Sequence, residues 1–137
     1  MSKGNFNIPY PINEPILPYA PGSPEREEVT QVYHTMKNQE AIDVPMYIGG
    51  AEVRTHDKRP MSPPHNHQHI LGHFNYGDAE HVRAGIDAAL AARPAWAALP
   101  WNERAAVFLK AADLLAGPYR AKINAATMLA QSKNIFQ

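Results

Sequence analysis

The fold is decided by the stretch Arg104-Ala105-Ala106-Val107-Phe108-Leu109-Lys110-Ala111-Ala112-Asp113-Leu114-Leu115. It contains no proline or glycine, and its apolar residues recur at the spacing of one helical face. Together with its flanks it predicts a helix over residues 101–116, capped by Gly117. The apolar stripe of this helix consists of Trp101, Ala105, Phe108, Leu109, Ala112 and Leu115.

A second clear helix is predicted upstream, from Ser23 to about Asn38. Ser23 suits the N-cap, and Pro24 suits the first helical position, where a missing N–H costs nothing. Acidic residues follow in the first turn, near the positive end of the helix dipole. One apolar stripe runs along it through Val29, Val32, Tyr33 and Met36.

The segment between these helices has β character. Residues 44–48 and 51–55 flank Gly49-Gly50, which predicts a hairpin with a primed turn. Residues 69–76 are interpreted as another strand, and the basic pair Lys58-Arg59 as part of a solvated loop.

Two further helices complete the pattern. Asp78 is the expected N-cap of a helix over residues 79–92, and Pro94 and Pro100 are expected to bracket a short connecting turn. A last helix is predicted to begin at Pro118. It is expected still to be running at Gln137, because no Gly, Asn or Pro closes it, so the chain is expected to be truncated in this helix.

The first 22 residues form a proline-rich arm. Their five prolines (Pro9, Pro11, Pro15, Pro18, Pro21) disfavour helix and favour an extended, polyproline-like path. Apolar residues lie between the prolines, so we expect the arm to lie along a protein surface. The sequence thus predicts an α/β fold with two parts: an arm over 1–22, and over 23–137 one helix, a small β ribbon and three helices.

Composition excludes several classes of function. Thirteen basic residues balance thirteen acidic ones, which argues against nucleic acid as a partner. No residue is cysteine, so disulfides, thiolate metal sites and a cysteine nucleophile are absent from these 137 residues. Neither an apolar membrane span nor a targeting signal is recognisable, and a cytoplasmic protein without membrane contacts is expected.

The most conspicuous polar cluster is His65-Asn66-His67-Gln68-His69. On a regular strand, alternate residues share one face, so His65, His67 and His69 could converge on Zn²⁺. The segment follows two prolines, however, and has few carboxylates near it. A polar loop with solvated or hydrogen-bonded histidines is the favoured interpretation, and metal binding is the alternative.

Other catalytic motifs are missing. Gly49-Gly50 is not followed by the Lys-Ser/Thr of a phosphate-binding loop, and no G-x-G-x-x-G occurs. The serines lack the context of a hydrolase nucleophile. We therefore expect no catalytic, cofactor-binding or metal-binding residue in this sequence.

The order of motifs resembles the N-terminal portion of the aldehyde dehydrogenase family. It is most similar to the branch that oxidises L-glutamate γ-semialdehyde, the 1-pyrroline-5-carboxylate dehydrogenases. The stretches that carry the resemblance are 13–15, 22–26, 48–53, 62–67, 84–90, 104–115, 127–129 and 131–133, and the most specific is 104–115. The resemblance covers essentially the whole sequence.

This resemblance implies a function for a complete enzyme rather than for this sequence alone. It implies NAD-dependent oxidation of the semialdehyde to L-glutamate in proline catabolism, by a homo-oligomer acting on a small molecule. The family's catalytic cysteine, general-base glutamate and dinucleotide-binding segment are expected after Gln137. The cofactor domain is thus expected to be incomplete here, and the isolated chain to bind no NAD and to be inactive.

Two other hypotheses belong to different classes. One is a small stand-alone module that binds metal through the three histidines. The other is an interaction protein that docks through its arm on a full-length relative. If the chain is instead part of the dehydrogenase, exposed apolar stripes are expected on its helices, and with them poor folding of the isolated chain.

Overall fold

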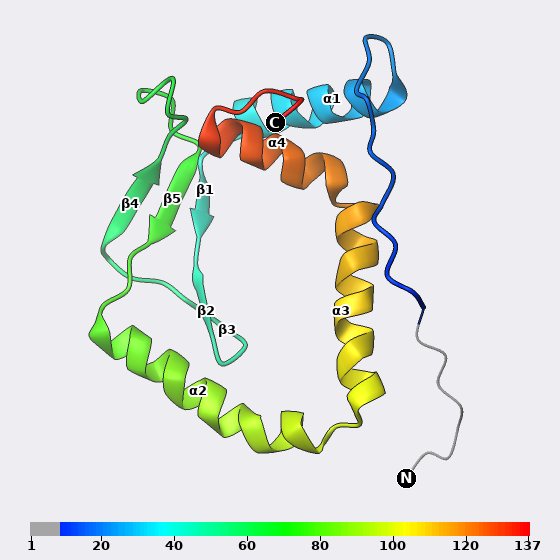
Figure 1. The fold of residues 1–137 in the computed structure, drawn as a ribbon. Coiled ribbons are helices and arrows are strands. Elements are labelled where there is room, and N and C mark those ends of the chain that lie inside the picture. The colour runs from blue at the N-terminus through cyan, green and yellow to red at the C-terminus, as the bar shows by residue number, and fades with distance from the viewer. Residues whose placement is uncertain (1–8) are drawn as a thin grey trace.

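The helices and strands are arranged around an open frame rather than a single central core. The computed structural model describes residues 9–137. Helices α1 and α4 lie side by side along one edge, the strands form the next, and α2 and α3 form the other two (Figure 1). The elements are α1 (Pro24–Asn38), β1 (Ile42–Val44), β2 (Met46–Ile48), β3 (Ala51–Val53), β4 (Lys58–Met61), β5 (Gly72–Asn75), α2 (Ala79–Ala98), α3 (Trp101–Ala116) and α4 (Arg120–Gln131).

The strands form two small sheets. Strands β2 and β3 are antiparallel, and both turn residues between them have positive φ, +60° at Gly49 and +82° at Gly50. The predicted hairpin is thereby confirmed. The second sheet has the order β1-β5-β4, with β1 parallel and β4 antiparallel to β5. A Cβ at Gly72 would stand 2.5 Å from the carbonyl oxygen of Ile42, so the close approach of β1 to β5 requires glycine there.

The prediction that Lys58-Arg59 is solvated is confirmed, since both side chains are exposed, but the prediction that the pair lies in a loop is wrong. Both residues belong to β4, which pairs with β5. Lys58 Nζ lies 2.9 Å from the Asp43 carboxylate, and the Arg59 guanidinium lies over the Tyr76 ring, 3.9 Å from its centroid. Asp43 in β1 and Tyr76 just after β5 are distant from this pair in sequence, so the contacts leave no trace in the local sequence.

The strand predicted over residues 69–76 is shorter than expected. It begins at Gly72, because the chain around His69 is in turns and bends. Of β1, only Val44 was predicted to lie in a strand, the first strand of the hairpin. Pro45 separates β1 from β2, and β1 pairs with β5 instead.

The small hydrophobic core lies between α1 and α4. Val29 is 1% exposed and Ala125 is fully buried. The predicted stripe of α1 packs here, since Val32, Tyr33 and Met36 all contact this core. By contrast, α2 and α3 contain no buried residue.

The starts of α1, α2 and α3 are as predicted, whereas α4 begins at Arg120 and not at Pro118, because Pro118 and Tyr119 lie in a turn. The Asp78 carboxylate accepts hydrogen bonds from the backbone N–H groups of Glu80 and His81, as expected of an N-cap. Ser23 occupies the N-cap position of α1, but its hydroxyl makes no capping hydrogen bond. That hydroxyl is buried and without a partner among residues 9–137.

Two predicted helix ends are wrong. Helix α2 does not stop at residue 92 but continues through Pro94 to Ala98, so no turn separates Pro94 from Pro100. Helix α4 does not run on to Gln137: it ends at Gln131, because Ser132 adopts the left-handed conformation with φ +54°. Bounds for α3 agree with the prediction, including Gly117 at its C-cap.

Residues 9–20 of the predicted arm contain neither helix nor strand, and a turn follows at Pro21-Gly22. Residues 1–8, with Phe6 and Ile8, lie outside the described part of the chain. The α/β class and the order of arm, helix, strands and three helices are as predicted, while the division at residue 22 into two parts stays a prediction.

Candidate functional site

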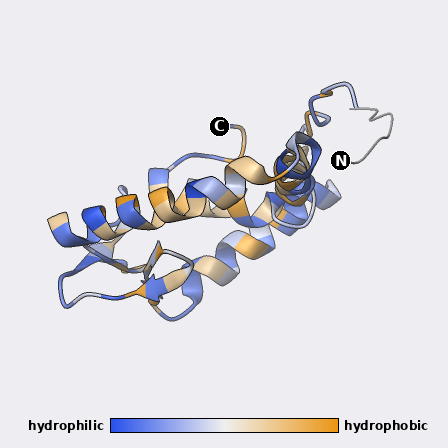
Figure 2. Ribbon diagram, turned by 90° about the horizontal axis from the view of Figure 1, so that it is seen from below, coloured by the Kyte–Doolittle hydropathy of each residue, from blue (hydrophilic) through white to orange (hydrophobic). Residues whose placement is uncertain are grey.

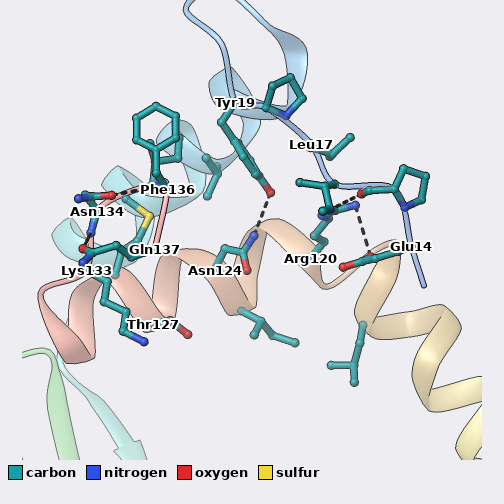
Figure 3. A pocket seen from close by; sticks show the side chains of 18 residues that line it. Glu14, Leu17, Tyr19, Arg120, Asn124, Thr127, Lys133, Asn134, Phe136 and Gln137 are labelled. Carbon is teal, nitrogen blue, oxygen red and sulfur yellow. Dashed lines mark hydrogen bonds and ion pairs between the residues drawn. The ribbon is translucent and has the colours of Figure 1, made fainter.

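A pocket lies between the arm and α4. It has a volume of about 750 Å³ and is lined by arm residues 14–19, by one side of α4 and by residues 133–137 (Figure 3). Its walls come from segments that are far apart in sequence, so its geometry depends on how the arm is held.

One arginine holds the arm against α4. Arg120 Nη1 lies 3.4 Å from the Glu14 carboxylate, and its Nη2 donates to the carbonyl oxygen of Pro15 at 3.2 Å. These bonds, drawn as dashed lines in Figure 3, join residues more than a hundred positions apart. The guanidinium fork can thus bind a carboxylate and a backbone carbonyl together.

Tyr19 is the second anchor of the arm. Its hydroxyl accepts a hydrogen bond from Asn124 Nδ2 at 3.0 Å, and its carbonyl oxygen accepts one from Arg26 at 3.1 Å. The residue has φ +49°, and its ring packs against the core of α1 and α4. A non-glycine residue in the left-handed region is uncommon, so these contacts hold the backbone in a conformation it would otherwise avoid.

The pocket has the features of a docking site for the arm rather than of a catalytic centre. Its lining includes no histidine or cysteine, and its carboxylate, Glu14, is already paired with Arg120. Ile135 and Phe136 make the far end apolar. The lining residues therefore supply no pair of nucleophile and base.

The histidine cluster does not have the strand geometry that a shared metal face requires. His65, His67 and His69 lie in turns and bends between β4 and β5. His65 Nδ1 is hydrogen-bonded to Ser132 Oγ at 2.6 Å, and His69 Nε2 donates to the carbonyl oxygen of Lys37 at 2.8 Å. Two of the three rings thus tie this loop to the ends of α4 and α1. Over residues 9–137, no three His, Cys, Asp or Glu side chains are grouped so that they could hold a metal ion.

A charged network joins the two sheets. The Asp43 carboxylate lies 2.9 Å from Arg54 Nε and 2.9 Å from Lys58 Nζ. Hydrogen bonds from Lys58, and next from Arg54, hold the pKa of Asp43 below its ordinary value. The buried Asn75 completes the network: its Nδ2 donates to Asp43 and to the carbonyl oxygen of Val44, and its Oδ1 accepts from the backbone N–H of Thr55.

A second carboxylate of the hairpin is also stabilised in its charged form. The Glu52 carboxylate accepts hydrogen bonds from the Tyr47 hydroxyl at 2.8 Å and from Arg54 at 2.6 Å. These bonds, that of Tyr47 first, lower the pKa of Glu52, and the same contact raises the pKa of Tyr47. Because all these groups are paired with one another, the network connects strands and leaves none of its carboxylates free to act as a base.

Comparison with known protein families identifies the family of this chain. The model of the aldehyde dehydrogenase family matches residues 53–137. The chain belongs to the aldehyde dehydrogenase family. The match covers β4, β5, α2, α3 and α4, so the stretch 104–115 lies well inside it.

Several relatives of this aldehyde dehydrogenase chain share the name Delta-1-pyrroline-5-carboxylate dehydrogenase. A Delta-1-pyrroline-5-carboxylate dehydrogenase from Agaricus bisporus is 48% identical over 96% of this chain, and the mitochondrial one from Mus musculus is 46% identical over 91%. A solved structure of the Mycobacterium tuberculosis Delta-pyrroline-5-carboxylate dehydrogenase, bound with NAD and cobalamin, is 42% identical over 94% of the chain with a TM-score of 0.88. The fold class, the N-terminal part of an aldehyde dehydrogenase fold, is thereby confirmed.

This aldehyde dehydrogenase chain spans only about a quarter of these proteins. It covers 24% of the Agaricus bisporus relative, 22% of the mouse relative and 24% of the Mycobacterium tuberculosis chain. Within the part that the structure describes, no helix has the length and apolar character needed to cross a membrane.

Sequence reasoning missed the residues that fix the arm. It expected the arm to lie on a surface but did not single out Glu14, Arg120 or Asn124. No local signal marks them, because each contact joins the arm to α4 across the whole chain. The expectation that the sequence contains no catalytic, cofactor or metal residue stays a prediction.

Proposed function

We propose that this chain is the N-terminal part of an NAD-dependent dehydrogenase that oxidises L-glutamate γ-semialdehyde to L-glutamate in proline catabolism. The observation that carries the proposal is the similarity to proteins named for this activity, at more than 40% identity over nearly the whole chain. Its substrate would be a small molecule, as in those relatives' names.

The role proposed for the described residues is structural. Arg120 and Tyr19 hold the arm, the Asp43 network joins the sheets, and α2 and α3 extend outward from them. The reaction expected of the family needs a thiolate to attack the aldehyde, and no residue here is cysteine. The chemistry is therefore assigned to the part of the enzyme that this chain does not span.

NAD is the proposed cofactor of the complete enzyme, since a relative has been solved with it. The residues described do not fit a dinucleotide site by themselves. Gly49 and Gly50 form the turn of a hairpin and lead into strand β3, whereas a phosphate-binding loop must lead into the N-terminus of a helix. We propose that NAD contacts other parts of the enzyme.

The first prediction is that the isolated chain is inactive. Purified chain with NAD⁺ and L-glutamate γ-semialdehyde at pH 7–8 is expected to produce no NADH above the protein-free rate, because it lacks a thiol nucleophile. Absorbance at 340 nm measures this. Turnover that co-purifies with the chain through two chromatographic steps would contradict the assignment of the chemistry to another part.

The proposed activity itself is tested in the organism that carries the gene. Disrupting the gene is expected to remove NAD-dependent oxidation of the semialdehyde from cell extracts and to make proline unusable as a nitrogen source. Reintroducing the gene with its natural downstream sequence should restore both. Unchanged activity in the disrupted strain would point to a different substrate.

We also propose that the complete enzyme is a homo-oligomer located in the cytoplasm. Light scattering of the native enzyme measures its mass, and cell fractionation followed by immunoblotting measures its location. A monomer in the first experiment, or an organellar pellet in the second, would contradict the respective proposal.

A further inference from the structure

One ring nitrogen in the first turn of α2 lies within hydrogen-bonding distance of two groups that require opposite proton states. His81 Nδ1 is 3.2 Å from the backbone nitrogen of Asp78 and 2.7 Å from Asp78 Oδ1. The backbone N–H can only donate, so it requires a lone pair on Nδ1. The carboxylate can only accept, so it requires a hydrogen on Nδ1. A single nitrogen cannot satisfy both groups at once.

The other hydrogen bonds at the start of α2 indicate which group a neutral ring takes. Asp78 Oδ1 already accepts the backbone N–H of Glu80 at 2.9 Å and that of His81 at 3.1 Å. Those two bonds use both lone pairs of this oxygen. The N–H of Asp78, by contrast, has His81 Nδ1 as its acceptor and no other within residues 9–137. A neutral ring therefore satisfies more groups when its hydrogen is on Nε2 and Nδ1 accepts.

Protonation removes this arrangement. An imidazolium ring has a hydrogen on each nitrogen and no lone pair to offer. Histidine ordinarily titrates near about pH 6.5, within the physiological range. Asp78 is still charged there, because hydrogen bonds from the His81 backbone and next from its side chain hold the pKa of Asp78 below its ordinary value. The charged ring is thus attracted to the carboxylate, and the Asp78 N–H loses its acceptor.

We propose that His81 is a proton-operated switch at the junction of β5 and α2. The neutral ring closes the junction by accepting the Asp78 N–H, and the protonated ring opens it by donating to the Asp78 carboxylate instead. This role does not depend on which aldehyde the complete enzyme oxidises, so it goes beyond the proposed function.

The surroundings of His81 suit such a switch. Its side chain is 26% exposed, so water can bring a proton to the ring, and Asp78 is its ion-pair partner. On α2, Glu80 adjoins it in sequence and bonds to Asp78 through its backbone, while residues 84–85, one turn later, are uncharged. The neighbour from β2 is the uncharged Met46, whose sulfur flanks the same glycine as the His81 Cβ.

The switch acts on a helix that few contacts hold in place. Helix α2 buries none of its residues, and hydrophilic and hydrophobic residues alternate along the helices in Figure 2. Its start is held from β2, where a Cβ at Gly77 would lie 2.8 Å from Met46 Sδ. Opening the junction frees the N–H directly after this glycine, which is the residue type with the most backbone freedom. We therefore expect the start of α2 to be held less firmly at low pH.

Nuclear magnetic resonance of the chain labelled with ¹⁵N tests the switch. At about pH 8 the nitrogen shifts of His81 should show the lone pair on Nδ1, and at about pH 5 both nitrogens should be protonated. Over the same range, protection of the Asp78 amide against exchange should fall about fivefold, relative to an unstructured peptide at each pH. That factor corresponds to the loss of one ordinary hydrogen bond.

Two variants fix the switch in either state. His81→Gln supplies an oxygen that accepts the Asp78 N–H at every pH, as in a common capping box, so protection should stay high throughout. His81→Lys supplies donors only, so protection should be low throughout. The matched control is His67→Gln, which makes the same change at an exposed histidine between β4 and β5 and should leave the response of Asp78 as it is.

The isolated chain is expected to fold poorly, so the comparison is repeated in the enzyme expressed from the gene with its natural downstream sequence. There, hydrogen exchange measured by mass spectrometry on a peptide over residues 76–84 gives the same readout. Three results would overturn the switch: a hydrogen on Nδ1 at pH 8, protection of Asp78 that does not change with pH, or an unaltered pH response in His81→Gln. None of them bears on the proposed function, which the gene disruption tests.

Discussion

At the scale of single residues, Ser132 determines where the last helix, α4, ends. The sequence predicted that α4 continues, because residues that commonly end helices were missing. Ser132 ends it in the left-handed conformation, and its hydroxyl is hydrogen-bonded to His65, 67 positions away. A contact over that distance leaves no local pattern, which is why it could not be foreseen.

Ser132 yields a prediction that ranks two variants. Ser132→Ala keeps the strained φ and loses the hydrogen bond to His65, whereas Ser132→Gly loses the bond but relieves the strain. The alanine variant should therefore hold α4 less firmly than the glycine variant, by about 1 kcal/mol. Native-state hydrogen exchange of residues 125–131 measures this. The control is His65→Ala, which removes the bond alone; equal exchange in the alanine and glycine variants would argue against backbone strain at Ser132.

Asp43 provides a prediction on pH. Its pKa is lowered in the folded chain, so near pH 4 the folded state binds fewer protons than the unfolded state. The stabilising effect of Asp43 is thus present above its ordinary pKa of about 3.9 and is lost as the pH falls through its lower, folded value. The carboxyl carbon resonance of Asp43 should titrate below the ordinary range, and Lys58→Gln should move it upward. A control variant, Lys133→Gln, carries the same change away from the network and should leave the titration as it is.

At the scale of elements, the helices were more predictable than the sheet. Helix α3 has the predicted bounds because its stripe, its capping glycine and its lack of prolines all act locally. Strand β4 was missed because Lys58 and Arg59 are exposed charged residues, and their contacts with Asp43 and Tyr76 join segments that are apart in the sequence. The parallel pairing of β1 with β5 likewise joins residues about thirty positions apart.

The predicted end of α2 was wrong for a different reason: the rule that proline ends a helix was given too much weight. Pro94 removes one hydrogen bond but does not end the helix, which continues to Ala98. Pro94→Ala is expected to stabilise the C-terminal part of α2, by up to about 3 kcal/mol at this exposed site. Slower amide exchange over residues 90–98 would support this. The comparison variant Ala92→Gly should act in the other direction, by about 1 kcal/mol, and faster exchange in Pro94→Ala would contradict the prediction.

At the scale of the whole molecule, stability is expected to be uneven. The core holds Val29 and Ala125, while α2 and α3 bury no residue. Amide protection in the isolated chain should be greatest in α1 and α4 and weakest in α2 and α3, since few buried contacts allow local opening. Exchange measured by mass spectrometry at several times tests this. Uniform protection of all four helices would mean that the open faces of α2 and α3 are already covered.

The candidate site illustrates the limit of sequence reasoning at the same scale. The family could be recognised from helical stretches, and the absence of cysteine could be read directly. The contacts of Arg120 with Glu14 and Pro15 could not, because they join the arm to the first residue of α4, more than a hundred positions away. The histidine cluster drew attention for a metal, yet two of its rings serve as ties between loop and helix ends.

The residues of β4 affect how readily the newly synthesised chain aggregates before it has bound any other polypeptide. Both outer strands of the three-stranded sheet offer open backbone, and such edges readily recruit strands from other molecules. Pro60 contributes no N–H on β4, its neighbours Lys58 and Arg59 are charged, and β1 is only three residues long before Pro45. A newly synthesised chain is thereby protected from cross-β aggregation through this sheet. The exposed apolar faces of its helices can still associate with other molecules.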